Sequence, residues 1–182
     1  MSFLDFALRM HSYWFLGLFT FWTVWNSPYK ELLNFNKSKI LKFTLFIIAV
    51  SAFRFFMIKN LIQYNINTKM FEAAKILPLG GTLFTWWEDL AFTMPLILLK
   101  SFSENRNLLK PFYYIALIIT ILSFASGHIY QGLFSAAFIS LYIPFGVIFG
   151  RKNGLGTLMT CHVLYDFFTL LTVKIALSLY GM

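Results

Sequence analysis

Ionisable side chains are scarce in this chain, and several of them lie inside apolar segments. Glu88 and Asp89 are neighbours in one such segment, His128 ends a second, and His162 and Asp166 lie four residues apart in a third. An ionisable group in hydrocarbon is costly unless it faces a polar interior and has a partner. The gathering of these five groups in so few segments predicts one shared intramembrane site.

The spacing of these residues indicates what they do. Adjacent helical residues point about 100° apart, so Glu88 and Asp89 can face different neighbours, and burial with mutual repulsion suits one of them to work as a general base. His162 and Asp166 lie one turn apart, as do two metal ligands on a helix or an imidazole and the carboxylate that orients it. Phe124 precedes His128 by one turn and is expected to pack against its ring.

The elements that position these residues are predicted to be membrane helices. Hydrophobic residues make up 59% of the chain and charged residues 12%, whereas soluble proteins have roughly 25% charged residues. We predict an all-α fold, a polytopic transmembrane bundle that forms a single integral membrane domain over residues 1–182. About six spans are expected: Ser12–Trp25, Ile40–Ile58, Ile76–Leu99, Pro111–Tyr130, Leu133–Gly150 and Leu155–Leu179.

The basic residues indicate orientation and exclude one class of partner. Lysine and arginine are concentrated in the separators around residues 26–42, 100–110 and 151–152, which a six-span arrangement places on the same side. The positive-inside rule predicts that this side is cytoplasmic. No basic cluster with stacking aromatic residues lies outside the spans, so nucleic acid is not an expected partner. The single cysteine, Cys161, excludes an internal disulfide framework.

The order of these motifs resembles a known family. Glu88-Asp89 with Phe92, then Phe124-x-x-x-His128, then a glycine-containing turn leading to His162-x-x-x-Asp166 are similar to the motifs of the CAAX protease and bacteriocin-processing (CPBP) family of intramembrane proteases. That family's pattern is Glu-Glu-x-x-x-Arg, Phe-x-x-x-His and His-x-x-x-Asn or Asp on successive membrane helices. The resemblance covers residues 80–168, which would carry the catalytic core.

The resemblance implies a role for each matching residue. Glu88 would be the catalytic base that activates water, and His128 would help to bind that water or a metal. His162 and Asp166 would complete a metal site or stabilise an oxyanion, with Asp89 and Phe124 in secondary positions. An ionised aspartate has no hydrogen to donate to an oxyanion, which favours a zinc site formed by Glu88, His128, His162 and Asp166. A metal-free reaction with water activated by glutamate is also compatible with these residues.

Two departures from the family pattern leave alternatives open. Asp89 stands where the family has its second glutamate, and Thr93 stands where it has arginine. Without that cation, the chain could be an inactive relative that acts as a bacteriocin-immunity or scaffold protein. A proton-coupled transporter would also explain buried acids and histidines. Each residue further has a structural interpretation: either histidine as an interhelical hydrogen-bonding group, Asp166 as a counter-ion of Arg54, and Phe124 as packing.

The favoured prediction is an enzyme, an intramembrane endopeptidase of the CPBP type and a hydrolase. It would cleave a peptide bond in a membrane-associated peptide or protein, and its surroundings would be the lipid bilayer of a bacterial inner membrane. The expected cofactor is Zn2+, with none as the alternative. Arg54 has a second possible role, as the cation that is missing at Thr93.

Overall fold

The described part of the chain is entirely helical. The computed structural model describes residues 11–63, 68–104, 106–129 and 132–179, and no strand occurs within them, which confirms the all-α prediction. In chain order the helices are α2 (His11–Trp25), η1 (Pro28–Leu33), α3 (Lys37–Gln63), α4 (Thr68–Ile76), η2 (Leu79–Phe84), α5 (Thr85–Glu88), η3 (Asp89–Thr93), α6 (Met94–Glu104), η4 (Asn107–Leu109), α7 (Lys110–Gly127), α8 (Leu133–Ser140), α9 (Tyr142–Asn153) and α10 (Leu155–Leu179).

Among the described residues, three helical stretches are long and apolar enough to cross a membrane. They are Lys37–Ile58, Asn107–Gly127 and Leu155–Leu179, and a shorter apolar helix covers Phe15–Trp25. These spans indicate an integral membrane protein. The prediction of about six spans is not confirmed, because the expected third and fifth segments are divided into shorter helical pieces.

The divisions follow from local sequence. In the expected third span, α4 ends at Ile76, and Pro78 is the extended residue before η2; the residue before a proline is steered away from helical geometry. In the expected fifth span, α8 ends at Ser140 and α9 begins at Tyr142. Pro144 lies in the first turn of α9, where its missing N–H group costs no helical hydrogen bond.

A π-helical segment interrupts the helix that carries the two acids. α5, η3 and α6 follow one another without a gap from Thr85 to Glu104, and η3 is the π-helical part, Asp89–Thr93. The N–H group of Met94 bonds to the carbonyl oxygen of Asp89, five residues earlier. Single π turns inside α-helices occur frequently at functional sites. Here the wide turn begins directly after Glu88.

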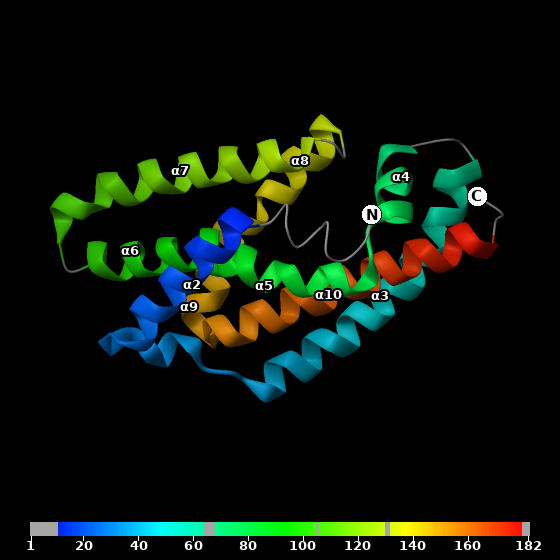
Figure 1. Cartoon of the computed structure of the whole chain (residues 1–182). Coiled ribbons are helices and arrows are strands. Elements are labelled where there is room, and N and C mark those ends of the chain that lie inside the picture. Colours follow the sequence, from blue (N-terminus) through cyan, green and yellow to red (C-terminus); the bar gives the residue numbers. More distant parts are fainter. Residues whose placement is uncertain (1–10, 64–67, 105, 130–131, 180–182) are drawn as a thin grey trace.

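Helix α10 lies at the centre of the arrangement. It packs against α3, α9, α5, η2 and α4, and Figure 1 shows it running through the molecule beside α3, with α7 farther away. In the most apolar part of each candidate span, 22% of the residues are buried in α10. The corresponding fraction is only 11% in α3 and in the stretch that contains α7. The side chains that α3 and α7 leave exposed include Phe46, Phe53, Ile118 and Leu122. Such apolar outer surfaces fit contact with lipid.

The first half of α10 lies in a different apolar core from the second half. Leu155 and Leu158 belong to a cluster with Met94 and Ile97 of α6, to which α9 and α7 also contribute. Val173, Ala176 and Leu177 belong to a second cluster with Ile58, Phe71 and Ala74 from α3 and α4. The middle of α10, which carries His162 and Asp166, therefore lies between two packed regions.

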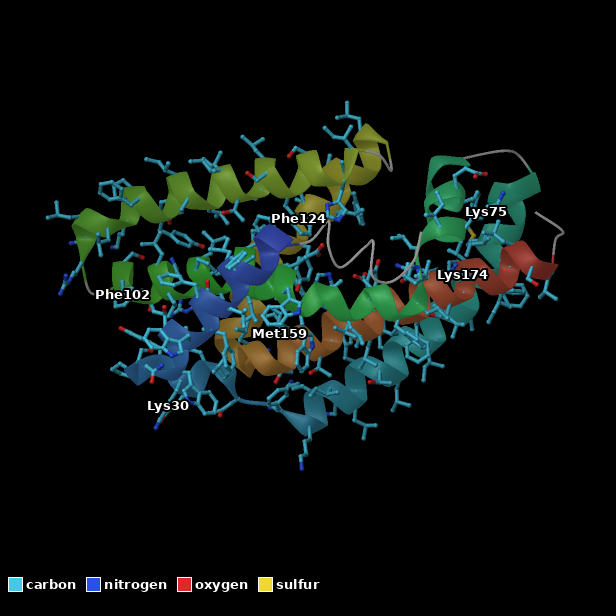
Figure 2. All side chains as sticks on the ribbon, viewed as in Figure 1. Lys30, Lys75, Phe102, Phe124, Met159 and Lys174 are labelled. Carbon is cyan, nitrogen blue, oxygen red and sulfur yellow. The ribbon has the colours of Figure 1, made fainter. Side chains whose placement is uncertain are left out.

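The three candidate spans run in the same direction. In Figure 1, α3, α7 and α10 each begin towards the left of the view and end towards the right. Figure 2 shows Lys30 near the end of the molecule where these helices begin, whereas Lys75 and Lys174 lie near the opposite end. Parallel spans must be joined by chain that returns across the molecule, and α5, η3 and α6 provide one such return.

Candidate active site

Asp89 is the most deeply buried acid of the described residues. Its side chain is 1% exposed at the start of the π-helical segment. The Tyr142 hydroxyl donates to its Oδ1 at 2.6 Å, and the Thr93 hydroxyl donates to the same oxygen at 3.1 Å. The His162 ring donates from Nδ1 to Oδ2 at 3.1 Å. Both carboxyl oxygens of Asp89 thus accept hydrogen bonds, and these bonds hold Tyr142, Thr93 and His162 in place.

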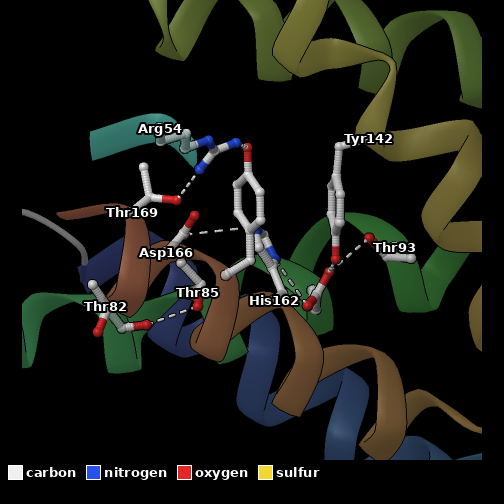
Figure 3. A network of polar contacts seen from close by, with 10 residues as sticks. Arg54, Thr82, Thr85, Thr93, Tyr142, His162, Asp166 and Thr169 are labelled. Atoms are coloured by element: carbon white, nitrogen blue, oxygen red, sulfur yellow. Dashed lines mark hydrogen bonds and ion pairs between the residues drawn. The ribbon is translucent and has the colours of Figure 1, made fainter. Parts of the chain in front are cut away.

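His162 is held through its ring nitrogens and one ring face. Because a carboxylate only accepts, the Nδ1 atom that contacts Asp89 carries the proton, and Nε2 points to the other side of the ring. Nε2 lies 3.6 Å from Oδ2 of Asp166, one turn along α10. The Tyr142 ring covers the imidazole, with 4.1 Å between the ring centroids. Figure 3 shows His162 between Asp166 and the side chains of Tyr142 and Thr93.

Glu88 differs from its neighbour in having an uncommitted carboxyl group. It ends α5 and is half-buried, and among the residues that the structure describes it has no hydrogen-bond or ion-pair partner. It lies within electrostatic range of His162, Asp166 and Asp89. Adjacent acids thus have different roles: Asp89 anchors His162, and Glu88 can accept a proton.

His128 approaches the same group of residues from α7. It follows the last residue of α7, and its Nδ1 lies 2.8 Å from the carbonyl oxygen of Phe124. A carbonyl accepts, so Nδ1 is the protonated nitrogen in this contact. The rings of Phe124 and His128 have centroids 4.5 Å apart, which is the packing expected from their spacing. His128 lies within electrostatic range of Asp166, as Glu88 does of His162 and Asp166, so the four residues lie in one region.

Arg54 adds a cation beside this region. Its guanidinium donates to the Thr169 hydroxyl and to the Tyr165 hydroxyl, each at 2.5 Å, and lies 4.7 Å from the centre of the Tyr165 ring. Both partners are on α10, one on each side of Asp166 in the sequence. An arginine in a membrane helix is expected to find polar partners. Arg54 is within electrostatic range of Asp166, but the structure records no direct ion pair between them.

The zinc site expected from the sequence stays a prediction. In the described ranges, no group of three or more His, Cys, Asp or Glu residues converges as metal ligands do. A zinc ligand must present a lone pair to the metal. At His162 the Nδ1–H group is bonded to Asp89, which leaves Nε2, 3.6 Å from Oδ2 of Asp166, as the nitrogen that could do so. Because no such group of residues converges within the part of the chain that the structure describes, we derive no chemical step through zinc.

Two contributors to the site were not identified from the sequence. Tyr142 lies more than fifty residues from Asp89 in the chain, and only the packing of α9 against η3 brings them together. In the sequence, Tyr142 is a hydroxyl-bearing aromatic residue in an otherwise apolar segment. Such a residue usually indicates the membrane interface and not a functional site. Thr93 was noted only as a departure from the family pattern, although its spacing of four from Asp89 suits a hydrogen bond along the helix.

Comparisons with protein-family models, with curated proteins and with solved structures return no match to this chain.

Proposed function

We propose that this protein is an intramembrane endopeptidase in which Glu88 activates the attacking water. The observation that carries the proposal is the contrast between the two adjacent acids: Asp89 is saturated with donors, whereas the half-buried Glu88 carboxyl is uncommitted beside the anchored His162. The resemblance of the three motifs to the CPBP proteases supports the same assignment. The substrate would be a membrane-associated peptide or protein in a bacterial inner membrane.

The proposed reaction uses only side chains of this chain. The Glu88 carboxylate takes a proton from water while the water oxygen attacks the carbonyl carbon of the scissile peptide bond. The tetrahedral oxyanion needs an N–H donor, and the imidazolium form of His162 would supply it from Nε2, since its Nδ1–H group is bonded to Asp89. His128, whose Nδ1–H group is bonded to Phe124, would accept a hydrogen bond from the attacking water at Nε2. When the C–N bond breaks, Glu88 returns its proton to the leaving amine. Asp166 lies too far from Nε2 for a normal hydrogen bond, and its proposed contribution is the negative charge that it places beside His162.

Glu88→Gln tests the proposal. Hydrolysis of a fluorescently labelled casein by purified protein in detergent is measured for the wild type, Glu88→Gln and Glu72→Gln. Glu72 is an exposed acid on α4 and serves as the matched control. We expect loss of essentially all hydrolysis in Glu88→Gln and none in Glu72→Gln, because the amide cannot accept the proton. Equal rates in Glu88→Gln and wild type would contradict the proposal.

The same assay decides the question of zinc. We expect hydrolysis to persist after treatment with a chelator, and elemental mass spectrometry to find less than stoichiometric zinc. Stoichiometric zinc that falls in both His128→Ala and His162→Ala would instead establish the metal site expected from the sequence. His162 would then bind the metal through Nε2 while its Nδ1–H group stays bonded to Asp89.

The alternative is an inactive relative with an immunity or scaffold role. Thr93 favours it, because a hydroxyl that bonds Asp89 replaces the cation found at this position in the family. The two functions differ in what Glu88→Gln does in cells. A bacteriocin-immunity protein would still protect its host with this substitution, whereas protection by proteolysis would be lost.

A further inference from the structure

Two recesses of different character adjoin near the beginnings of α3 and α10. One is polar, with a volume of about 560 Å3, and is lined by Lys37, Arg151 and Lys152 among others. The other is an apolar groove of about the same volume, lined by Phe21, Trp25, Trp86 and Met159 among others. They share three lining residues, Glu31, Asn34 and Phe35. A recess lined by charged residues therefore lies beside one lined by apolar residues.

The wall between the recesses is fixed by close packing against α10. Thr157 is fully buried, and its hydroxyl accepts the N–H group of Asn36 at 2.7 Å and donates to the carbonyl of Asn153 at 2.7 Å. Gly156 leaves no space for a side chain, since a Cβ there would lie 2.6 Å from the carbonyl oxygen of Leu33 and 2.8 Å from the Phe35 ring. This packing fixes the position of the polar recess relative to the apolar groove.

The polar recess has unbalanced positive charge. Lys37 and Lys152 are exposed, and neither has an ion-pair partner within the described residues. Arg151 is engaged, because it donates to both carboxylate oxygens of Glu104 at 2.6 Å. Glu31 is the single acid in the lining. The recess therefore favours an anion.

The apolar groove favours a hydrocarbon chain. Trp25, Phe35 and Trp86 each leave more than a third of their surface exposed along it. The groove and the polar recess both lie where candidate spans begin, which is where lipid headgroups meet acyl chains. Basic pockets at the ends of membrane helices are suited to anionic headgroups.

We propose that these two recesses bind one anionic phospholipid, with its phosphate at Lys37 and Lys152 and one acyl chain in the groove. The occupant follows from charge and polarity: the phosphate complements the two unpaired lysines, and the chain covers exposed aromatic surface. The groove also contacts α5 and α10, the helices that carry Glu88 and His162. The proposal does not depend on the protein being a peptidase.

The test is lipid retention by delipidated protein in detergent, measured by native mass spectrometry. Dioleoyl phosphatidylglycerol is titrated against dioleoyl phosphatidylcholine, which has the same chains and no net charge. We expect the double variant Lys37→Gln/Lys152→Gln to bind phosphatidylglycerol about thirty-fold more weakly. The control variant Lys42→Gln/Lys110→Gln loses two exposed lysines that line neither recess, and its affinity is expected to stay within about threefold of the wild type.

Two further measurements distinguish binding of the lipid headgroup from binding of its acyl chain. Trp25→Gln should weaken binding of both lipids to a similar extent, because it alters the groove and not the charge. Glycerol 3-phosphate at millimolar concentration should not displace the bound lipid, since it lacks a chain. Equal retention of phosphatidylglycerol by the double variant and the control, or equal retention of the two lipids by the wild type, would overturn the proposal. Displacement by glycerol 3-phosphate would also overturn it and would indicate a site for small anions.

Discussion

At the scale of single residues, the site is organised by an unequal pair of acids. Asp89 takes three donors and becomes a structural anchor, whereas Glu88 keeps its carboxyl group uncommitted. An anchored imidazole has one tautomer and one orientation, which is the condition for a repeated proton transfer or a fixed N–H donor. The two residues are neighbours in sequence, yet their surroundings assign them different chemistry.

Asp89→Asn tests the role of the anchor. The amide can keep hydrogen bonds to Tyr142 and Thr93, but its NH2 group cannot accept the Nδ1–H group of His162. We expect the hydrolysis rate to fall by about 10- to 100-fold, with KM nearly unchanged. The measurement is steady-state hydrolysis of labelled casein, with thermal unfolding in detergent as a check of folding. A variant with the full rate would show that His162 does not depend on this carboxylate.

At the scale of elements, the joint between η1 and α10 is the most constrained part of the fold. Gly154 lies just before α10 with φ of +92°, a conformation that residues with a Cβ rarely adopt. A Cβ there would also collide with the carbonyl oxygen of Asn34. This joint sets where α10 begins, and so how far along the molecule His162 and Asp166 are placed.

Gly154→Ala is therefore expected to destabilise the protein. Backbone strain of this kind costs about 1 to 3 kcal/mol, and the contact with Asn34 adds to it. Gly127→Ala is the matched control, because its φ is not positive and a Cβ would meet nothing within 4 Å. We expect a lower midpoint of thermal unfolding for Gly154→Ala and a change within about 1 kcal/mol for Gly127→Ala. Equal midpoints for the two variants would contradict the constraint described for the joint.

The sequence predicted the elements of this site better than their geometry. Composition was sufficient for a helical membrane protein, and i, i+4 spacing was sufficient for the contacts of His162 with Asp166 and of His128 with Phe124. It did not predict the divided third and fifth segments, because a window of mean hydropathy does not register a proline or a change of helix type. It also missed Tyr142, whose contact with Asp89 depends on long-range packing.

At the scale of the whole molecule, the parallel arrangement of α3, α7 and α10 gives the protein two unlike ends. The end where these helices begin carries Lys37, Arg106, Lys110, Arg151 and Lys152. The positive-inside rule assigns such an end to the cytoplasm. We therefore expect the two recesses near Lys37 and Lys152 to face the cytoplasmic leaflet.

This orientation is tested by labelling single cysteines in a Cys161→Ser background. Ser38→Cys, Asn107→Cys and Lys152→Cys lie near the starts of the three candidate spans, and Glu72→Cys lies on α4 near the opposite end. A membrane-impermeant maleimide should label the first three in inside-out vesicles and Glu72→Cys in intact cells. If any of the first three is labelled from the other side, that helix does not cross in the direction described.

The π-helical segment has a consequence for the way mutations can accumulate in this protein. Its wide turn puts the helix before Asp89 out of phase with the helix after Thr93, compared with a regular α-helix. If this segment became regular α-helix at constant length, Glu88 would turn by about 100° relative to the α6 core residues Leu96 and Ile97. Deletion of one residue in Leu90–Phe92 would instead remove the residue that the wide turn accommodates, and a regular helix would then keep Glu88 on nearly its present side. The conformation of this segment therefore matters more to the position of Glu88 than the exact number of residues in it.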